Sequence, residues 1–271
     1  ADVWSCPERY LVDEGGRLQF VTGVPPDYFS STGQRWGNPH YDWTHMKEEG
    51  FSWWLERLRA HFEWFDLVRI DHFRGLESVW MIDPGCETAV EGHWASTPGD
   101  ELLSALQGQL GELPLVAEDL GIITPEVTAL RRKFNLPGMA VLQFSFDEFE
   151  DNPHKPQNIT PDTVVYTGTH DNDTTRGWFD TLPAEQRQQV LAGLGDCEPA
   201  GVVDAMMTTA MQSRGQLCIV PLQDVLGLGG EARMNMPGDA EGHWQWRFDW
   251  SMIGETVAPA LKEMSCNAGR C

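Results

Sequence analysis

Hydrophobic positions along the chain fall into helix-like spacings and short continuous runs. Between residues 51 and 65, apolar side chains recur every three or four residues, which is typical of one face of an amphipathic helix. These residues are Phe51, Trp54, Leu55, Leu58, Phe62 and Phe65. An apolar run at residues 67–70 follows at once and has the length and composition of a buried strand.

The same order of strand and helix repeats further along the chain. Four more apolar runs predict strands at residues 115–117, 139–142, 163–166 and 217–220. Thr97-Pro98 and Thr124-Pro125 each predict a helix start, with the threonine as N-cap and the proline in the first turn. Helices are also expected at residues 183–192, 202–213 and 256–264. Such alternation predicts an α/β protein with parallel strands and helical crossovers.

Polar and acidic residues follow the expected strands. Asp71, Glu118 and Asp171 each lie where a strand ends, and a (β/α)8 TIM barrel places its active site at that face. A doubly wound open sheet would usually show a glycine-rich phosphate turn, but neither GxGxxG nor GxxxxGK[ST] occurs in the sequence. We therefore expect an incomplete barrel over residues 51–271, with about five of the eight βα units present.

Residues 1–50 lack this periodicity. Glycine, proline and aromatic residues are mixed there, most densely at residues 23–29 and 33–39. Proline and glycine at this density break regular structure, and a long ordered loop in a compact protein is usually functional. Because linkers are seldom so rich in aromatic residues, we expect residues 1–50 to form a substrate-binding loop region inserted in the barrel.

Composition narrows the possible partners. Lys plus Arg number 19 against 41 for Asp plus Glu, and the net charge of −22 repels nucleic acids and anionic membranes. No apolar stretch is long enough to span a bilayer. The six cysteines show no CxxC or zinc-type spacing, so we expect a cytoplasmic location. Twelve Trp and twelve Phe residues offer flat faces on which neutral ligands such as sugars stack.

Carboxylates at several strand ends suit the cleavage of glycosidic bonds. One carboxylate acts as nucleophile or base while another protonates the leaving oxygen. A metal site that includes His72 and His170 is disfavoured, because the sequence has neither HExxH nor HxH on a strand. A serine nucleophile is also unsupported, since no GxSxG elbow is present. We expect neither a metal nor a cofactor.

Several stretches of the sequence resemble the 4-alpha-glucanotransferases (amylomaltase, or disproportionating enzyme), and the resemblance covers essentially the whole chain. The stretches are residues 23–29, 69–75, 117–121, 168–174, 233–238 and 244–247. The resemblance implies a retaining transferase of the α-amylase superfamily that moves α-1,4-glucan segments between chains. Its partners would be maltooligosaccharides and α-1,4-glucans.

The resemblance also implies roles for individual residues. Asp71 would be the nucleophile, Glu118 the general acid/base and Asp171 the stabiliser of the transition state. Arg69 would hold Asp71 ionised, and His170 would contact a sugar hydroxyl in the donor site. Residues 27–36 would arch over the acceptor sites. The other expected substrate-binding residues are His72, Asp27, Tyr28, Phe29, Gln34 and Trp36.

The chain departs from the family pattern in one respect. Family members carry three more barrel strands before the segment that begins this chain, so we expect the chain to be the C-terminal part of a barrel, with the missing N-terminal part as a further partner. Two alternatives remain open. One is an α-glucan hydrolase or debranching enzyme of the same superfamily, and the other is a catalytically inactive glucan-binding fragment.

Overall fold

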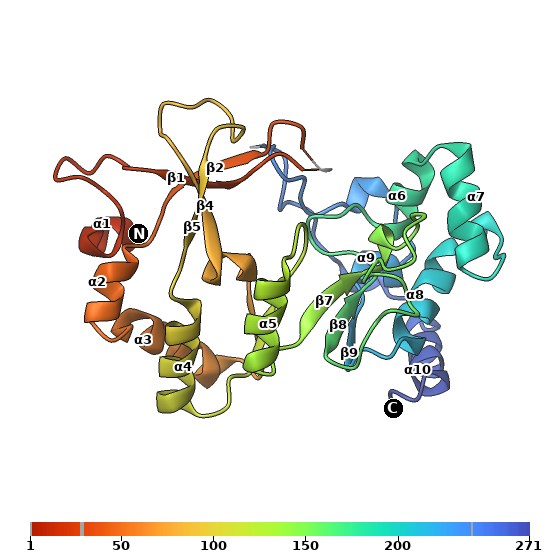
Figure 1. Cartoon of the computed structure of the whole chain (residues 1–271). Coiled ribbons are helices and arrows are strands. Elements are labelled where there is room, and N and C mark those ends of the chain that lie inside the picture. Colours follow the sequence, from red (N-terminus) through yellow and green to blue (C-terminus); the bar gives the residue numbers. More distant parts are fainter. Residues whose placement is uncertain (1, 28–29, 240) are drawn as a thin grey trace. The chain divides into compact units, whose positions relative to one another are not determined.

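The structure is a computed structural model that describes residues 2–27, 30–239 and 241–271. The chain divides into two compact units, Ala1–Gly138 and Met139–Cys271 (Figure 1). Each unit contains its own hydrophobic core and its own sheet or sheets. The two units are therefore described separately.

The first unit consists of two sheets and several helices. Its elements are α1 (Asp2–Ser5), β1 (Val21–Val24), β2 (Gln34–Pro39), α2 (Trp43–Glu48), α3 (Ser52–Trp64), β3 (Val68–Ile70), β4 (Ser78–Ile82), β5 (His93–Ser96), α4 (Gly99–Leu110), β6 (Leu115–Ala117) and α5 (Pro125–Lys133). One sheet is the parallel pair β3 and β6, and the other has the order β2-β1-β4-β5 with antiparallel neighbours.

Helix α3 carries the first apolar pattern into the core of this unit. Leu55 and Leu58 are buried and belong to one cluster with Leu102, Leu103 and Leu106 of α4. Each leucine that is fully buried contributes about 1.5–3 kcal/mol relative to an exposed one. Because α3 leads almost directly into β3, this packing fixes the position of the strand that precedes Asp71.

The prediction that residues 1–50 are irregular is wrong for the segments that form helices α1 and α2 and strands β1 and β2. Gly23, a residue that suggested a break, instead permits a close approach between these strands. A Cβ atom on Gly23 would lie 2.2 Å from the carbonyl oxygen of Gln34. Strands β4 and β5 were also not predicted, because they lie in a sequence region that shows no clear alternation of apolar and polar residues.

Helix α4 begins differently from the prediction. Pro98 occupies the N-cap position, and the Thr97 hydroxyl donates to the Gly75 carbonyl oxygen at 3.0 Å instead of capping the helix. A Cβ atom on Gly99 would lie 1.9 Å from the carbonyl oxygen of Leu76, so the first turn packs directly on backbone. At α5, by contrast, Thr124 is the N-cap and Pro125 the first helical residue, as predicted.

The second unit is built around a three-stranded sheet with the order β7-β8-β9. Its elements, the first of which starts at the unit boundary, are β7 (Gly138–Val141), β8 (Thr163–Tyr166), α6 (Thr175–Thr181), α7 (Ala184–Gly193), α8 (Val202–Gln212), β9 (Leu217–Ile219), α9 (Leu222–Val225) and α10 (Val257–Asn267). Strands β8 and β9 are parallel. Met206 and Ala210 of α8 pack in one buried cluster with Val165 of β8.

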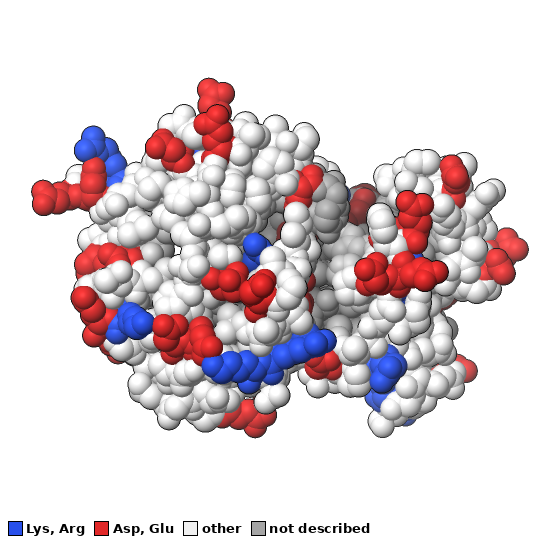
Figure 2. All heavy atoms as spheres, viewed as in Figure 1, with Lys and Arg blue, Asp and Glu red and all other residues white. Residues whose placement is uncertain are grey.

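The five strands predicted from apolar runs are confirmed as β3, β6, β7, β8 and β9, with ends that differ by one residue at most. The helices predicted in the second unit correspond to α7, α8 and α10. The fold is therefore mixed α/β, as expected. Figure 2 shows acidic side chains over much of the displayed face and fewer basic ones, in line with the net charge of −22.

Two further features concern the helices and the cysteines. None of the helices that the structure describes is long and apolar enough to cross a lipid bilayer. Cys266 and Cys271 form a disulfide that their spacing did not predict, whereas Cys6, Cys86, Cys197 and Cys218 are free thiols.

Candidate active site

Asp71 and Glu118 directly follow the two parallel strands of the first unit. Ile70, the last residue of β3, pairs with Ala117, the last residue of β6. The ladder continues beyond the strands, because the Glu118 N–H donates to Ile70 O at 2.9 Å and the Phe73 N–H donates to Glu118 O at 3.0 Å. The backbone thus places both acidic residues at the same edge of the sheet.

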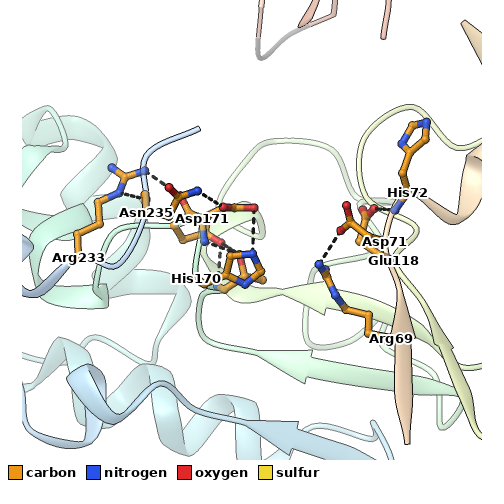
Figure 3. Close-up of polar contacts among 10 residues, drawn as sticks. Arg69, Asp71, His72, Glu118, His170, Asp171, Arg233 and Asn235 are labelled. Atoms are coloured by element: carbon orange, nitrogen blue, oxygen red, sulfur yellow. Dashed lines mark hydrogen bonds and ion pairs between the residues drawn. The ribbon is translucent and has the colours of Figure 1, made fainter. Parts of the chain in front are cut away.

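Arg69 and Asp71 form the ion pair that their spacing suggested. Residues two apart on a strand face the same side, and Arg69 Nη2 lies 2.6 Å from Asp71 Oδ1 (Figure 3). The Asp71 side chain is 78% exposed. Its carboxylate is therefore held by a cation and still open to a ligand.

Glu118 has a different environment. Its side chain is partly buried, and its two carboxylate oxygens accept hydrogen bonds from the backbone N–H groups of His72 (2.6 Å) and Leu120 (2.9 Å). Burial raises the pKa of Glu118 above its usual range, although the two N–H groups oppose this shift, and the charge of Asp71 adds to it. A carboxyl group with a raised pKa is suited to donate a proton near neutral pH.

His72 connects this strand end to the segment that was expected to bind the acceptor. The His72 backbone is in the left-handed region with a φ of 48°, and its ring meets the edge of the Trp36 ring at a centroid distance of 4.9 Å. Trp36 lies on β2, and its Nε1 donates to Gln34 Oε1 at 3.2 Å. Burial lowers the pKa of His72 to about 4, so its imidazole is neutral at pH 7.

The remaining residues expected in the acceptor loop are only partly described. Asp27 Oδ1 accepts a hydrogen bond from the Ser30 N–H at 2.9 Å, and the Asp27 N–H donates to Ser30 O at 3.0 Å. Tyr28 and Phe29 lie outside the described residues.

Asp171 of the second unit lies in a turn beyond the end of β8. The turn is stabilised by Thr169, whose N–H and hydroxyl both donate to Asn172 Oδ1, at 2.9 and 2.8 Å. His170 Nε2 lies 3.5 Å from Asp171 Oδ2. About half of the Asp171 side chain is exposed, since its relative accessibility is 46%.

Two residues from a later part of the chain donate hydrogen bonds to Asp171, and no role was predicted for either of them. Asn235 Nδ2 donates to Asp171 Oδ1 at 2.6 Å, and Arg233 Nη2 donates to the Asp171 carbonyl oxygen at 2.8 Å (Figure 3). Both residues lie in one of the stretches that resemble the family, but nothing in the irregular segment around them indicated a contact with Asp171. The family resemblance of residues 233–238 was the one feature of the sequence that pointed to a role for Arg233 and Asn235.

The family profile described as 4-alpha-glucanotransferase matches residues 1–252. This chain belongs to the 4-alpha-glucanotransferase family. Among curated proteins of the family, a 4-alpha-glucanotransferase of Synechocystis sp. is 52% identical over 100% of this chain, and one of Thermus thermophilus is 52% identical over 92% of it.

The solved structures include a similar chain. The amylomaltase from Streptococcus agalactiae in complex with acarbose has a TM-score of 0.95 and 35% sequence identity, and the match covers 99% of this chain and 55% of that one. The chain covers 54% of the Synechocystis protein and 51% of the Thermus protein. It therefore spans about half the length of the 4-alpha-glucanotransferases that it matches.

Two further acidic residues that follow strands β6 and β9 at a short distance are bonded to neighbouring side chains in this member of the 4-alpha-glucanotransferase family. Asp119 forms an ion pair with Arg131, with 3.2 Å between Oδ2 and Nε, and both side chains are largely buried. Asp224, near the end of β9, is 2% exposed and accepts hydrogen bonds from the Thr167 hydroxyl and from the N–H and hydroxyl of Thr175. Position at a strand end is thus insufficient by itself to identify a reacting acid.

The histidines near the acidic residues do not form a metal centre in the part of the chain that the structure describes. Within those residues, no group of three His, Cys, Asp or Glu side chains is close enough to hold a metal ion. His72 contacts Trp36, and His170 lies beside Asp171.

Proposed function

We propose that the protein containing this chain is a retaining 4-alpha-glucanotransferase, which moves segments of α-1,4-glucans from a donor to the 4-hydroxyl of an acceptor glucan. The observation that carries the proposal is the pair Asp71 and Glu118 at neighbouring strand ends in a family member. One carboxylate is exposed and paired with a cation, while the other is partly buried with a raised pKa. Acarbose bound to the Streptococcus agalactiae amylomaltase supports a maltooligosaccharide-like ligand.

The proposal includes the finer fold assignment. The strands β3, β6, β7, β8 and β9 would belong to a (β/α)8 barrel that is incomplete in this chain, and residues 1–50 would supply a substrate-binding region to the catalytic residues 51–271. The parallel pairs β3 with β6 and β8 with β9 support this assignment, as does the likeness to the amylomaltase structure.

In the first step, Asp71 would attack the anomeric carbon of the donor glucan. The bond to the leaving oxygen breaks, that oxygen takes the proton of Glu118, and a covalent glucosyl ester forms on Asp71. In the second step, the ionised Glu118 takes the proton of the acceptor 4-hydroxyl, whose oxygen attacks the same carbon and releases Asp71. Two displacements retain the configuration of the anomeric carbon.

The other residues would support these steps. The guanidinium of Arg69 would keep Asp71 in the ionised form that attacks, and Asp171 would stabilise the positive charge that develops on the sugar ring. His72, neutral at pH 7 because its pKa is about 4, and His170 would contact sugar hydroxyls. Asp27, Tyr28, Phe29, Gln34 and Trp36 would form the acceptor region, in which aromatic faces stack on glucose rings.

Incubation of the full-length protein with maltotriose tests the proposal. A transferase converts maltotriose into longer maltooligosaccharides and glucose, which chromatography separates. Formation of shorter sugars alone would indicate a hydrolase, and no change would indicate an inactive glucan-binding protein. Either of these two outcomes would overturn the proposal.

The cellular location forms a separate part of the proposal. We infer a cytoplasmic enzyme because four of the six cysteines, Cys6, Cys86, Cys197 and Cys218, are free thiols. The Cys266–Cys271 disulfide is an exception to this pattern, and a relative from Solanum tuberosum is named as chloroplastic/amyloplastic. Cell fractionation followed by detection of the protein tests this location. Recovery in an organelle fraction would contradict it.

A further inference from the structure

Trp244 combines three features that a packing role does not explain. Its φ is 61°, in the left-handed region that a bulky side chain rarely adopts. Its ring lies beside that of His170, with centroids 5.3 Å apart and planes inclined by 38°. The side chain is nevertheless 53% exposed. A strained backbone that presents a large ring to solvent is a feature of functional positions more than of structural ones.

The backbone on both sides of this ring is fixed. The Trp244 N–H donates to Met234 O at 2.8 Å, and Arg247 Nη1 donates to Trp244 O at 2.9 Å. Met234 lies between Arg233 and Asn235, the two residues that hold Asp171. The same short segment therefore anchors both the carboxylate of Asp171 and the backbone of Trp244.

We propose that Trp244 stacks on a glucose ring of the donor glucan, next to the ring that His170 contacts. The proposal rests on the proposed function, because it assigns a residue to the donor side of that reaction. An indole face covers the apolar C–H face of a glucose ring, and this contact needs no charge on the ligand. The net charge of −22 therefore leaves it unaffected.

Another exposed tryptophan of the same unit provides a matched control. Trp250 is 79% exposed, more than Trp244, and its ring contacts Phe248. Since Trp250 has the same ring chemistry without a contact to His170, it separates a stacking site from a general effect of surface tryptophans.

Binding should be measured first, in full-length protein with the background substitution Asp71→Asn, which prevents turnover. Titration calorimetry with maltoheptaose compares Trp244→Ala, Trp244→Gly, Trp244→Phe and Trp250→Ala. We expect Trp244→Ala and Trp244→Gly to weaken binding by about five- to tenfold, as the loss of one aromatic stacking contact predicts. Trp244→Phe should restore most of the affinity, and Trp250→Ala should leave it unchanged.

The Gly variant distinguishes stacking from a structural role. Because glycine adopts a φ near 61° without strain, Trp244→Gly should melt at a higher temperature than Trp244→Ala and yet bind maltoheptaose as weakly. In the active background, Trp244→Ala should raise the KM for maltoheptaose while the KM for α-glucosyl fluoride, which carries a single ring, stays unchanged.

The two proposals fail in different ways. If the Asp71→Asn protein does not bind maltoheptaose at all, the proposed function is wrong, and the inference about Trp244 falls with it. If that protein binds maltoheptaose and Trp244→Ala binds it equally well, the proposed function stands and the role of Trp244 is wrong. The role of Trp244 would also be wrong if Trp244→Ala lost affinity together with melting temperature while Trp244→Gly lost neither.

Discussion

In the first unit, Asp71 and Glu118 continue two paired strands, whereas in the second unit Asp171 lies in a turn beyond its strand. The Glu118 carboxylate accepts hydrogen bonds from the backbone N–H groups of His72 and Leu120. The Asp171 carboxylate instead accepts a hydrogen bond from the side-chain amide of Asn235, and the Arg233 guanidinium donates to the backbone carbonyl oxygen of Asp171. Glu118 is thus positioned mainly by main-chain groups, whereas Asp171 relies on side chains from a distant part of the sequence.

The difference predicts how each acid tolerates substitution around it. A backbone donor survives most side-chain changes, so the position of Glu118 should depend on few neighbouring residues. A side-chain donor is lost with one substitution. Substitutions of residues that donate hydrogen bonds to Asp171, but do not themselves react, should therefore lower activity. The predictions below test this contrast, starting with the largest expected effect.

Asp71→Asn should lower turnover by at least about a thousandfold, because the amide keeps the shape of the carboxylate but does not attack the anomeric carbon. Binding of maltoheptaose should persist. Steady-state rates and calorimetry measure the two properties. Asp66→Asn, at an exposed acid before the same strand, is the control and should retain full activity. More than a few per cent of wild-type turnover in Asp71→Asn would exclude its role as nucleophile.

Glu118→Gln should lower turnover of maltooligosaccharides by about a hundredfold or more, since their leaving oxygen needs the proton of the acid. The consumption of α-glucosyl fluoride should fall much less, because fluoride leaves without strong protonation. Comparison of the two donors measures the contrast. Equal losses on both would show that Glu118 is not the general acid.

The same residue predicts a pH dependence. Burial raises the pKa of Glu118, so its protonated form persists above the usual carboxyl range of about 4.3. As the pH rises through this raised pKa, Glu118 ionises and turnover of maltooligosaccharides should fall. The fall should be absent from the rate at which Glu118→Gln consumes α-glucosyl fluoride. A fall that remains in this variant would belong to another group.

The contrast between the units also explains what the sequence predicted. Asp71 and Glu118 follow uninterrupted apolar runs, and the spacing of Arg69 and Asp71 placed them on the same side of a strand, where they form an ion pair. The positions of Asp71 and Glu118 depend on neighbouring residues or on strand register, and both can be predicted from the pattern of apolar residues. The surroundings of Asp171 depend on residues more than sixty positions later, in an irregular segment whose contacts no periodicity reveals.

Two other outcomes follow the same reasoning. Asp224 lies in α9, shortly after β9, but its burial and its bonds to Thr167 and Thr175 depend on tertiary contacts. The strands β1 and β2 escaped prediction because glycine in a strand looks like a break unless the close approach of a neighbour is known. The apolar pattern thus located the parallel strands and missed the antiparallel sheet.

Asn235→Ala should lower kcat by about tenfold to a hundredfold, which corresponds to the loss of one hydrogen bond to a charged group. The KM for the donor should change less than twofold, since the role proposed for Asp171 lies mainly in the transition state. Steady-state kinetics with maltoheptaose measure both constants. Asn158→Ala, at an asparagine of the same unit that bonds only to backbone carbonyls of a separate loop, is the control. Unchanged kcat in Asn235→Ala would mean that the turn alone positions Asp171.

The smallest expected effect concerns the competition between an acceptor glucan and water. Water is present at roughly 55 M, so the glucosyl intermediate reaches a sugar acceptor only if the site excludes water and orients the acceptor hydroxyl. Trp36 is 41% exposed, and its ring contacts that of His72, the residue after Asp71, so we expect it to contribute to both. We expect Trp36→Ala to raise the ratio of hydrolysis to transfer by about threefold to tenfold, the value of one aromatic contact.

The Trp36 experiment compares glucose release with chain-extended products from maltotriose. Consumption of α-glucosyl fluoride should stay largely intact, because formation of the intermediate does not use the acceptor region. Trp36→Phe should fall between the wild type and Trp36→Ala, since it keeps a smaller flat face. The ring of Trp36 also packs against His72, so a purely structural role would lower the melting temperature and the rates of both reactions together. A wild-type ratio of hydrolysis to transfer in Trp36→Ala would show that the ring only packs β2 against the strand end, and that water is excluded by other residues.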